Sequence, residues 1–95
     1  MKEPKTSREI WRYQLGPDEN VLTMPVGARV LSVATKRGHP HLWVWVDPHE
    51  QQTENRVFRI FGTGEPICEA HELLFIGTFL IEDETLVFHC FEVKP

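Results

Sequence analysis

The chain has 95 residues, of which 41% are hydrophobic and 25% are charged, and its formal net charge is -4. This length and composition are typical of one soluble globular domain, and the acidic balance argues against non-specific nucleic-acid binding, which needs a basic surface. No apolar run approaches the roughly 20 residues of a membrane-spanning helix.

The N-terminal residues 1–8 are polar and contain Pro4, so they predict a flexible tail rather than the apolar core of a secretory signal. Residues 9–95 predict a single domain. Cys68 and Cys90 do not have a spacing typical of a disulfide framework, although one disulfide between them stays open. We expect a cytoplasmic protein with reduced thiols.

Residues 9–15 predict a half-buried strand. Ile10 and Arg12 alternate with Trp11 and Tyr13, which places the aromatic rings together on the inner face. The segments that follow are a turn at residues 16–18, a shorter strand at residues 20–24 and a turn at residues 25–27.

Residues 28–47 predict the hairpin around which the rest of the chain is arranged. Two runs of β-branched and aromatic residues flank a linker at residues 36–40, a pattern typical of a hairpin with a longer loop. Trp43 and Trp45 lie two residues apart and share one face, whereas the apolar residues 42, 44 and 46 take the other. A strand that is apolar on both faces needs cover from a second sheet, a barrel interior or another subunit.

The C-terminal half continues the pattern of short strands. Residues 55–61 predict a strand that places Arg56 and Arg59 on opposite faces. Residues 73–81 and 85–93 predict a second hairpin across the acidic turn at residues 82–84. Residues 67–72 could form one helical turn but are too short to assign.

These elements together predict an all-β fold. The expected architecture is a small antiparallel β-sandwich or barrel of about seven short strands with at most one short helical turn.

The order of these motifs resembles a family of small uncharacterised proteins found in bacteriophage and prophage genomes. The resemblance covers about residues 10–92. It is carried by Ile10-Trp11-Arg-Tyr13, Met24-Pro25-Val-Gly27-Ala28-Arg-Val-Leu31-Ser32-Val33, Leu42-Trp43, Val46-Asp47-Pro48, Phe58-Arg59-Ile60-Phe-Gly62-Thr63-Gly64-Glu-Pro66-Ile67, Gly77-Thr78-Phe79 and Leu86-Val87-Phe88-His89. The resemblance implies a phage or prophage setting and an all-β domain, and it implies no catalytic residues. In that setting the cytoplasm that we expect is the cytoplasm of the host.

Four residues are of the types found in a Cys2His2 metal site, but their spacing in the sequence does not match such a site. Cys68 and His71 are followed by His89 and Cys90, which are adjacent on an expected strand and point to opposite faces. The pair His39 and His41 would share a strand face, yet both flank the expected hairpin linker and we interpret them as exposed. We therefore predict no metal site and no cofactor.

No catalytic constellation is evident. The Gly62–Gly64 loop follows a strand, but Glu65 and Pro66 come next, and an acidic residue and a missing backbone donor do not suit phosphate binding. Ser32 lies in the middle of a strand without the glycine-flanked turn that exposes a nucleophile. We predict that the protein is not an enzyme.

Arginines within apolar strands are the strongest sign of a binding site. Arg29, Arg56 and Arg59 offer planar guanidinium groups that suit carboxylates or phosphates, and Trp43 or Trp45 could stack on a ring nearby. These five residues are the predicted ligand-binding set, for an anionic or nucleotide ligand. The alternative is that the arginines are simply exposed, or form ion pairs with Asp47, Glu54 or Glu65.

The chain is also rich in large apolar residues, with three Trp, six Phe and one Tyr. A homo-oligomer would cover the apolar surface that a single small domain cannot bury. The alternative is a closed barrel that shields this surface.

Our first hypothesis for the function is a phage accessory protein that sequesters a small ligand or binds a host protein, for instance in counter-defence. Two alternatives from other classes are a structural or assembly component of the virion and a metal-dependent enzyme.

Overall fold

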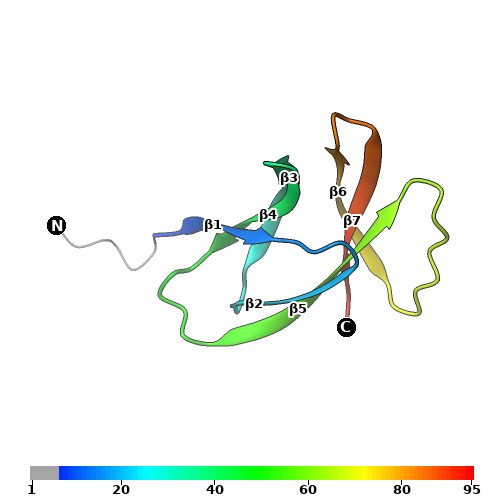
Figure 1. Ribbon diagram of the computed structural model, residues 1–95. Helices are drawn as coiled ribbons and strands as arrows, with labels where there is room; N and C mark the ends of the chain where they lie inside the picture. Colours follow the sequence, from blue (N-terminus) through cyan, green and yellow to red (C-terminus); the bar gives the residue numbers. More distant parts are fainter. Residues whose placement is uncertain (1–6) are drawn as a thin grey trace.

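The computed structural model describes residues 7–95, and in them the chain is all-β with seven strands and no helix (Figure 1). The predicted fold class is confirmed. The strands are β1 (Glu9–Gln14), β2 (Glu19–Pro25), β3 (Arg29–Lys36), β4 (His39–Val46), β5 (Thr53–Gly62), β6 (Leu73–Ile81) and β7 (Leu86–Val93). Most of the tail that we expected at residues 1–8 lies outside the described residues.

The strands form two antiparallel sheets, as a small β-sandwich requires. The three-stranded sheet has the order β1-β4-β3 and the four-stranded sheet has the order β2-β5-β7-β6. Strands β3 and β6 approach each other along one side of the sandwich, where the hydroxyl of Thr35 donates a hydrogen bond to the carbonyl oxygen of Leu80 at 2.6 Å. A Cβ atom added at Gly77 would lie only 3.0 Å from a methyl carbon of Val33, so this side is tightly packed.

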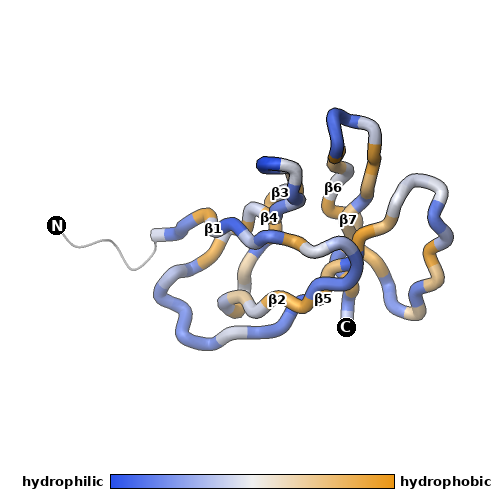
Figure 2. The backbone as a smooth tube through the Cα atoms, in the orientation of Figure 1, coloured by the Kyte–Doolittle hydropathy of each residue, from blue (hydrophilic) through white to orange (hydrophobic). Residues whose placement is uncertain are grey.

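The hydrophobic core lies between the sheets and follows the alternation of the strands. Leu42, Val44 and Val46 of β4 are almost fully buried, and Phe58 of β5 and Cys90 of β7 meet them from the other sheet. Hydrophilic residues gather at the tips of the β3–β4 and β6–β7 hairpins (Figure 2). The alternation therefore fixes which face of β4 is internal, and it leaves Trp43 and Trp45 on the outer face.

Two local predictions about the backbone are wrong. The β3–β4 hairpin does not have a longer loop, because Lys36 pairs with His39 and only two residues turn the chain. Arg37 and Gly38 both adopt positive φ, at 52° and 80°, the conformation of the tight hairpin turn that matches strand twist. The second error concerns residues 67–72, where no helical turn forms and the chain runs as an irregular loop from β5 to β6.

Among residues 7–95, no helix has the length and apolar character needed to cross a membrane.

Candidate functional site

Cationic and aromatic side chains line the outer face of the three-stranded sheet. Antiparallel pairing places Ile10 and Arg29 on either side of Trp45, and it places Arg12 beside Trp43. Because residues paired across strands share one face, these side chains form two adjacent rows. We call this surface the basic-aromatic face and define it by Ile10, Arg12, Arg29, His41, Trp43 and Trp45.

The first row holds a cation–π pair. The central guanidinium carbon of Arg29 lies 5.4 Å from the centroid of the Trp45 ring, within the range of an attractive interaction. Trp45 remains 39% exposed, so part of its indole is open to solvent. The pair offers a positive charge and a planar ring at the same place.

The second row adds another cation and a buried imidazole. Arg12 lies opposite Trp43, and His41 contacts Trp43 edge-on with ring centroids 5.9 Å apart. His41 is only 6% exposed, so the prediction that it is exposed is wrong, and its Nδ1 has no hydrogen-bond partner among the described residues. Burial lowers the pKa of His41, and the positive charges of Arg12, Lys36 and His39 lower it further. This imidazole is therefore neutral at neutral pH.

A shallow depression of about 280 Å³ lies at the end of the first row. It is lined by Arg8, Val26, Gly27, Arg29, Trp45 and Asp47. A β-bulge between Val30 and Ser32 interrupts the neighbouring edge strand, and bulges increase the local twist of a strand. The depression is therefore lined by two guanidinium groups, of Arg8 and Arg29, and by one carboxylate, of Asp47.

The charge of the protein is unevenly distributed. The three-stranded sheet and its β3–β4 turn contain four cationic residues, Arg12, Arg29, Lys36 and Arg37, against one anionic residue, Glu9. The chain as a whole has a net charge of -4. The basic-aromatic face therefore lies on a cationic sheet in an otherwise acidic protein, which favours an anionic partner there.

Arg56 lies in the other sheet, where its guanidinium is held by Glu92 and Ala28. Its guanidinium donates two hydrogen bonds to the carboxylate of Glu92, at 2.6 and 2.9 Å, and another to the carbonyl oxygen of Ala28. The hydrogen bond with Glu92 raises the pKa of Arg56, and the charges of Glu92 and Glu54 add to this effect. Since Ala28 leads into β3, Arg56 joins the two sheets and has a structural role.

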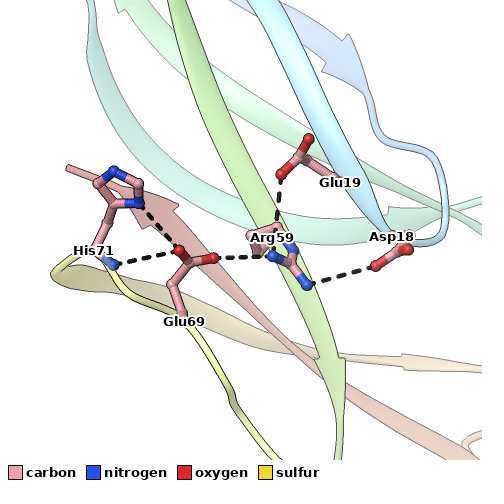
Figure 3. A network of polar contacts seen from close by, with 5 residues as sticks. All are labelled: Asp18, Glu19, Arg59, Glu69 and His71. Carbon is pink, nitrogen blue, oxygen red and sulfur yellow. Dashed lines mark hydrogen bonds and ion pairs between the residues drawn. The ribbon is translucent and has the colours of Figure 1, made fainter. Parts of the chain in front are cut away.

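Arg59 is the centre of a second ion-pair network (Figure 3). It contacts Glu69 at 2.9 Å and approaches Asp18 and Glu19 at 3.9 and 4.0 Å. Glu69 in turn accepts a hydrogen bond from the backbone N–H of His71, and its other contact with His71 is to the ring Nδ1 at 3.1 Å. The network fastens the β5–β6 loop to the outer face of the four-stranded sheet, beside an open depression of about 860 Å³.

The structure thus divides the predicted ligand-binding set. Arg29, Trp43 and Trp45 come together on the basic-aromatic face, whereas Arg56 and Arg59 point to opposite faces of the other sheet and bind carboxylates. The carboxylates in direct contact are Glu92, Asp18, Glu19 and Glu69, so the predicted ion-pair partners Asp47, Glu54 and Glu65 are wrong.

Sequence reasoning missed Arg12 and His41 as members of the site. Arg12 alternates with aromatic residues in its own strand, and His41 lies two residues from Trp43 and so on the same face of its strand. The sequence therefore indicated the face on which each side chain lies. What the sequence lacked was the pairing of β1 with β4, which is a long-range contact.

The residues considered for a metal site do not assemble in the described part of the chain. No group of three or more His, Cys, Asp or Glu side chains within residues 7–95 is arranged to hold a metal ion. His89 lies between the hydroxyls of Thr63 and Thr78, at 2.7 and 2.9 Å. Cys90 is fully buried on the opposite face, and burial raises the pKa of its thiol to about 12.

A family model described as a domain of unknown function (DUF7352) matches residues 6–95. The chain belongs to this family. The DUF7352 domain therefore contains all seven strands and the whole basic-aromatic face. No significant match to a curated protein or to a solved structure was found.

Proposed function

We propose that this DUF7352 domain acts by binding, and that its basic-aromatic face takes an anionic ligand with a planar ring, such as a nucleotide. The observation that carries the proposal is the Arg29–Trp45 pair, with the guanidinium carbon 5.4 Å from the ring centroid and the indole 39% exposed. The second cation–aromatic row at Arg12 and Trp43 and the depression beside Trp45 support it.

In this mode the ring of the ligand stacks on the open part of Trp45, and its phosphate meets Arg29. Stacking on an aromatic side chain contributes about 1–3 kcal/mol per base, and guanidinium groups match phosphate geometry with two parallel hydrogen bonds. The sheet that presents these groups is rigid, so little ordering of the protein is needed on binding.

Calorimetric titration with ATP tests the proposal, with adenosine as the ring-only probe and tripolyphosphate as the phosphate-only probe. We expect ATP to bind more tightly than either fragment. Trp45→Ala and Arg29→Ala should each weaken ATP binding about tenfold or more, since about 1.4 kcal/mol corresponds to a factor of ten.

Arg59→Ala is the matched control, because it removes a guanidinium that is already bound to carboxylates on the other sheet. This variant should bind ATP as the wild type does. Absence of binding by all three probes, or equal losses in the Arg29 and Arg59 variants, would refute the proposed site.

We further propose a wider role as a phage accessory protein that sequesters such a ligand in the host cytoplasm, for instance in counter-defence. Support for this role comes from the resemblance of the sequence to phage and prophage proteins and from a face suited to anionic ligands. A change in the nucleotide pool of bacteria that express the wild type, but not the Arg29→Ala variant, would support it. Stoichiometric presence of the protein in purified virions would instead favour a structural component.

A further inference from the structure

The outer edge of β1 is open in the described part of the chain. β1 pairs only with β4, and the N–H of Leu15, just beyond the strand, donates a hydrogen bond to the carbonyl oxygen of Pro40. Because backbone groups alternate in direction along an antiparallel strand, odd-numbered residues of β1 face β4. The N–H and C=O groups of Ile10, Arg12 and Gln14 therefore point away from the sheet, and none has a hydrogen bond within residues 7–95.

β1 lacks the bulges and prolines that commonly protect an edge from pairing with another chain, and its charged side chains are Glu9 and Arg12. The edge strands β3 and β6 each contain a bulge and face each other, and β2 ends at Pro25. β1 is regular over all six residues and contains no proline. Its apolar side chains are open to solvent, with Ile10 55% and Trp11 37% exposed. A regular, unpaired edge strand with exposed apolar side chains is a template for strand addition.

We propose that the partner of this edge is the β1 strand of a second copy. The two strands form an antiparallel dimer whose two-fold axis passes midway between the two Trp11 residues. Residues opposite each other in an antiparallel pair place their side chains on the same face of the sheet, so the axis must be perpendicular to the sheet. With the axis at Trp11, Ile10 lies opposite Arg12 and Glu9 lies opposite Tyr13. No like charges then face each other within β1.

Neighbouring registers are less favourable. An axis at Arg12 places the two Arg12 side chains directly opposite each other, which is destabilising. An axis at Ile10 shortens the paired segment to Glu9–Trp11, half of the six residues of β1. The axis at Trp11 uses the outward-pointing backbone groups of Ile10 and Arg12 in both copies and places the two Trp11 rings beside each other.

The dimer would join two three-stranded sheets into one continuous sheet of six strands. Because the axis is perpendicular to that sheet, both basic-aromatic faces point in the same direction, with Arg12 of each copy next to the seam. The dimer would therefore present two cationic faces to one extended partner. This inference does not depend on the nucleotide proposal, because the dimer forms through backbone groups of β1, whereas the proposed ligand contacts are the side chains of Arg29 and Trp45.

Native mass spectrometry of the wild-type chain over a concentration series tests the dimer first, and we expect a dimer that grows with concentration. Disulfide cross-linking then tests the register, in a Cys68→Ser background that removes the exposed thiol. At the axis the two Cα atoms of residue 11 form a non-hydrogen-bonded pair about 4.5 Å apart, which a disulfide can bridge. Trp11→Cys should therefore form a covalent dimer on mild oxidation.

Tyr13→Cys is the matched control on the same face of the same strand. Its two copies would lie about 13 Å apart along the strand direction, four residues at about 3.3 Å each, beyond the reach of a disulfide. A wild type that stays monomeric at every concentration overturns the proposal. Equal cross-linking at positions 11 and 13, or none at position 11, overturns the register.

Discussion

Removing Arg56 should destabilise the protein far more than removing Arg59. The side chains of Arg56 and Glu92 are only 17% and 14% exposed, and the guanidinium makes three hydrogen bonds. Arg56→Ala leaves the carboxylate of Glu92 and the carbonyl oxygen of Ala28 without these donors. Breaking a buried ion pair by removing one member costs 3–5 kcal/mol, and since this pair retains some exposure we expect about 3 kcal/mol.

Arg59→Ala is the matched control, three residues further along β5 and on the opposite face of the sheet. Two of its carboxylates, Asp18 and Glu19, are 82% and 56% exposed, and ion pairs of this kind contribute roughly 0–1 kcal/mol. Including the contact with Glu69, we expect a loss of about 1 kcal/mol. Denaturant unfolding followed by tryptophan fluorescence gives both free energies of unfolding.

In a thermal melt, the loss in Arg56→Ala corresponds to a decrease of roughly 12–24 °C in Tm for a domain of this size. The double variant Arg56→Met, Glu92→Leu should recover part of it, because no uncompensated charge is then buried. A loss in Arg56→Ala no greater than in Arg59→Ala would refute the idea that Arg56 joins the two sheets.

Three further predictions use other parts of the structure. Gly77→Ala should destabilise the fold by about 1–3 kcal/mol in denaturant unfolding, because the added Cβ would lie 3.0 Å from a methyl group of β3; an unchanged midpoint would contradict the close packing of β3 on β6. A thiol reagent should modify exposed Cys68 in the native protein, whereas Cys90 is buried with a pKa of about 12 and should react only after unfolding. Hydrogen bonds from His71 lower the pKa of Glu69. The attachment of the β5–β6 loop is therefore present above the unfolded pKa of this carboxyl group and is lost as the pH falls through its folded pKa. Limited proteolysis at decreasing pH should show earlier cleavage of the loop, and Glu69→Gln should remove this pH dependence.

Features set by local alternation were predictable from the sequence. The burial of Leu42, Val44 and Val46 and the outward position of Trp43 and Trp45 follow from the period of two in a strand. The all-β class follows in the same way from repeated short apolar runs between turns.

Features that depend on pairing between distant segments were not predictable. Arg56 and Glu92 are 36 residues apart and meet because β5 and β7 are neighbours, which no local pattern encodes. The tight turn at Arg37 escaped prediction for a different reason, because a non-glycine residue with positive φ has only a weak sequence signal. The same limit applies to Arg12, whose place beside Trp43 depends on the register of β1 with β4.

The order β2-β5-β7-β6 has a consequence for how the chain reaches its native state. The last of the seven strands to be synthesised, β7, lies between β5 and β6 and supplies the pairing edge for both. Until residues 86–93 have emerged from the ribosome, the four-stranded sheet cannot form, and β5 and β6 expose apolar strands without their neighbour. Completion of this sheet must therefore follow synthesis of β7, and until then the apolar strands β5 and β6 are open to non-native pairing.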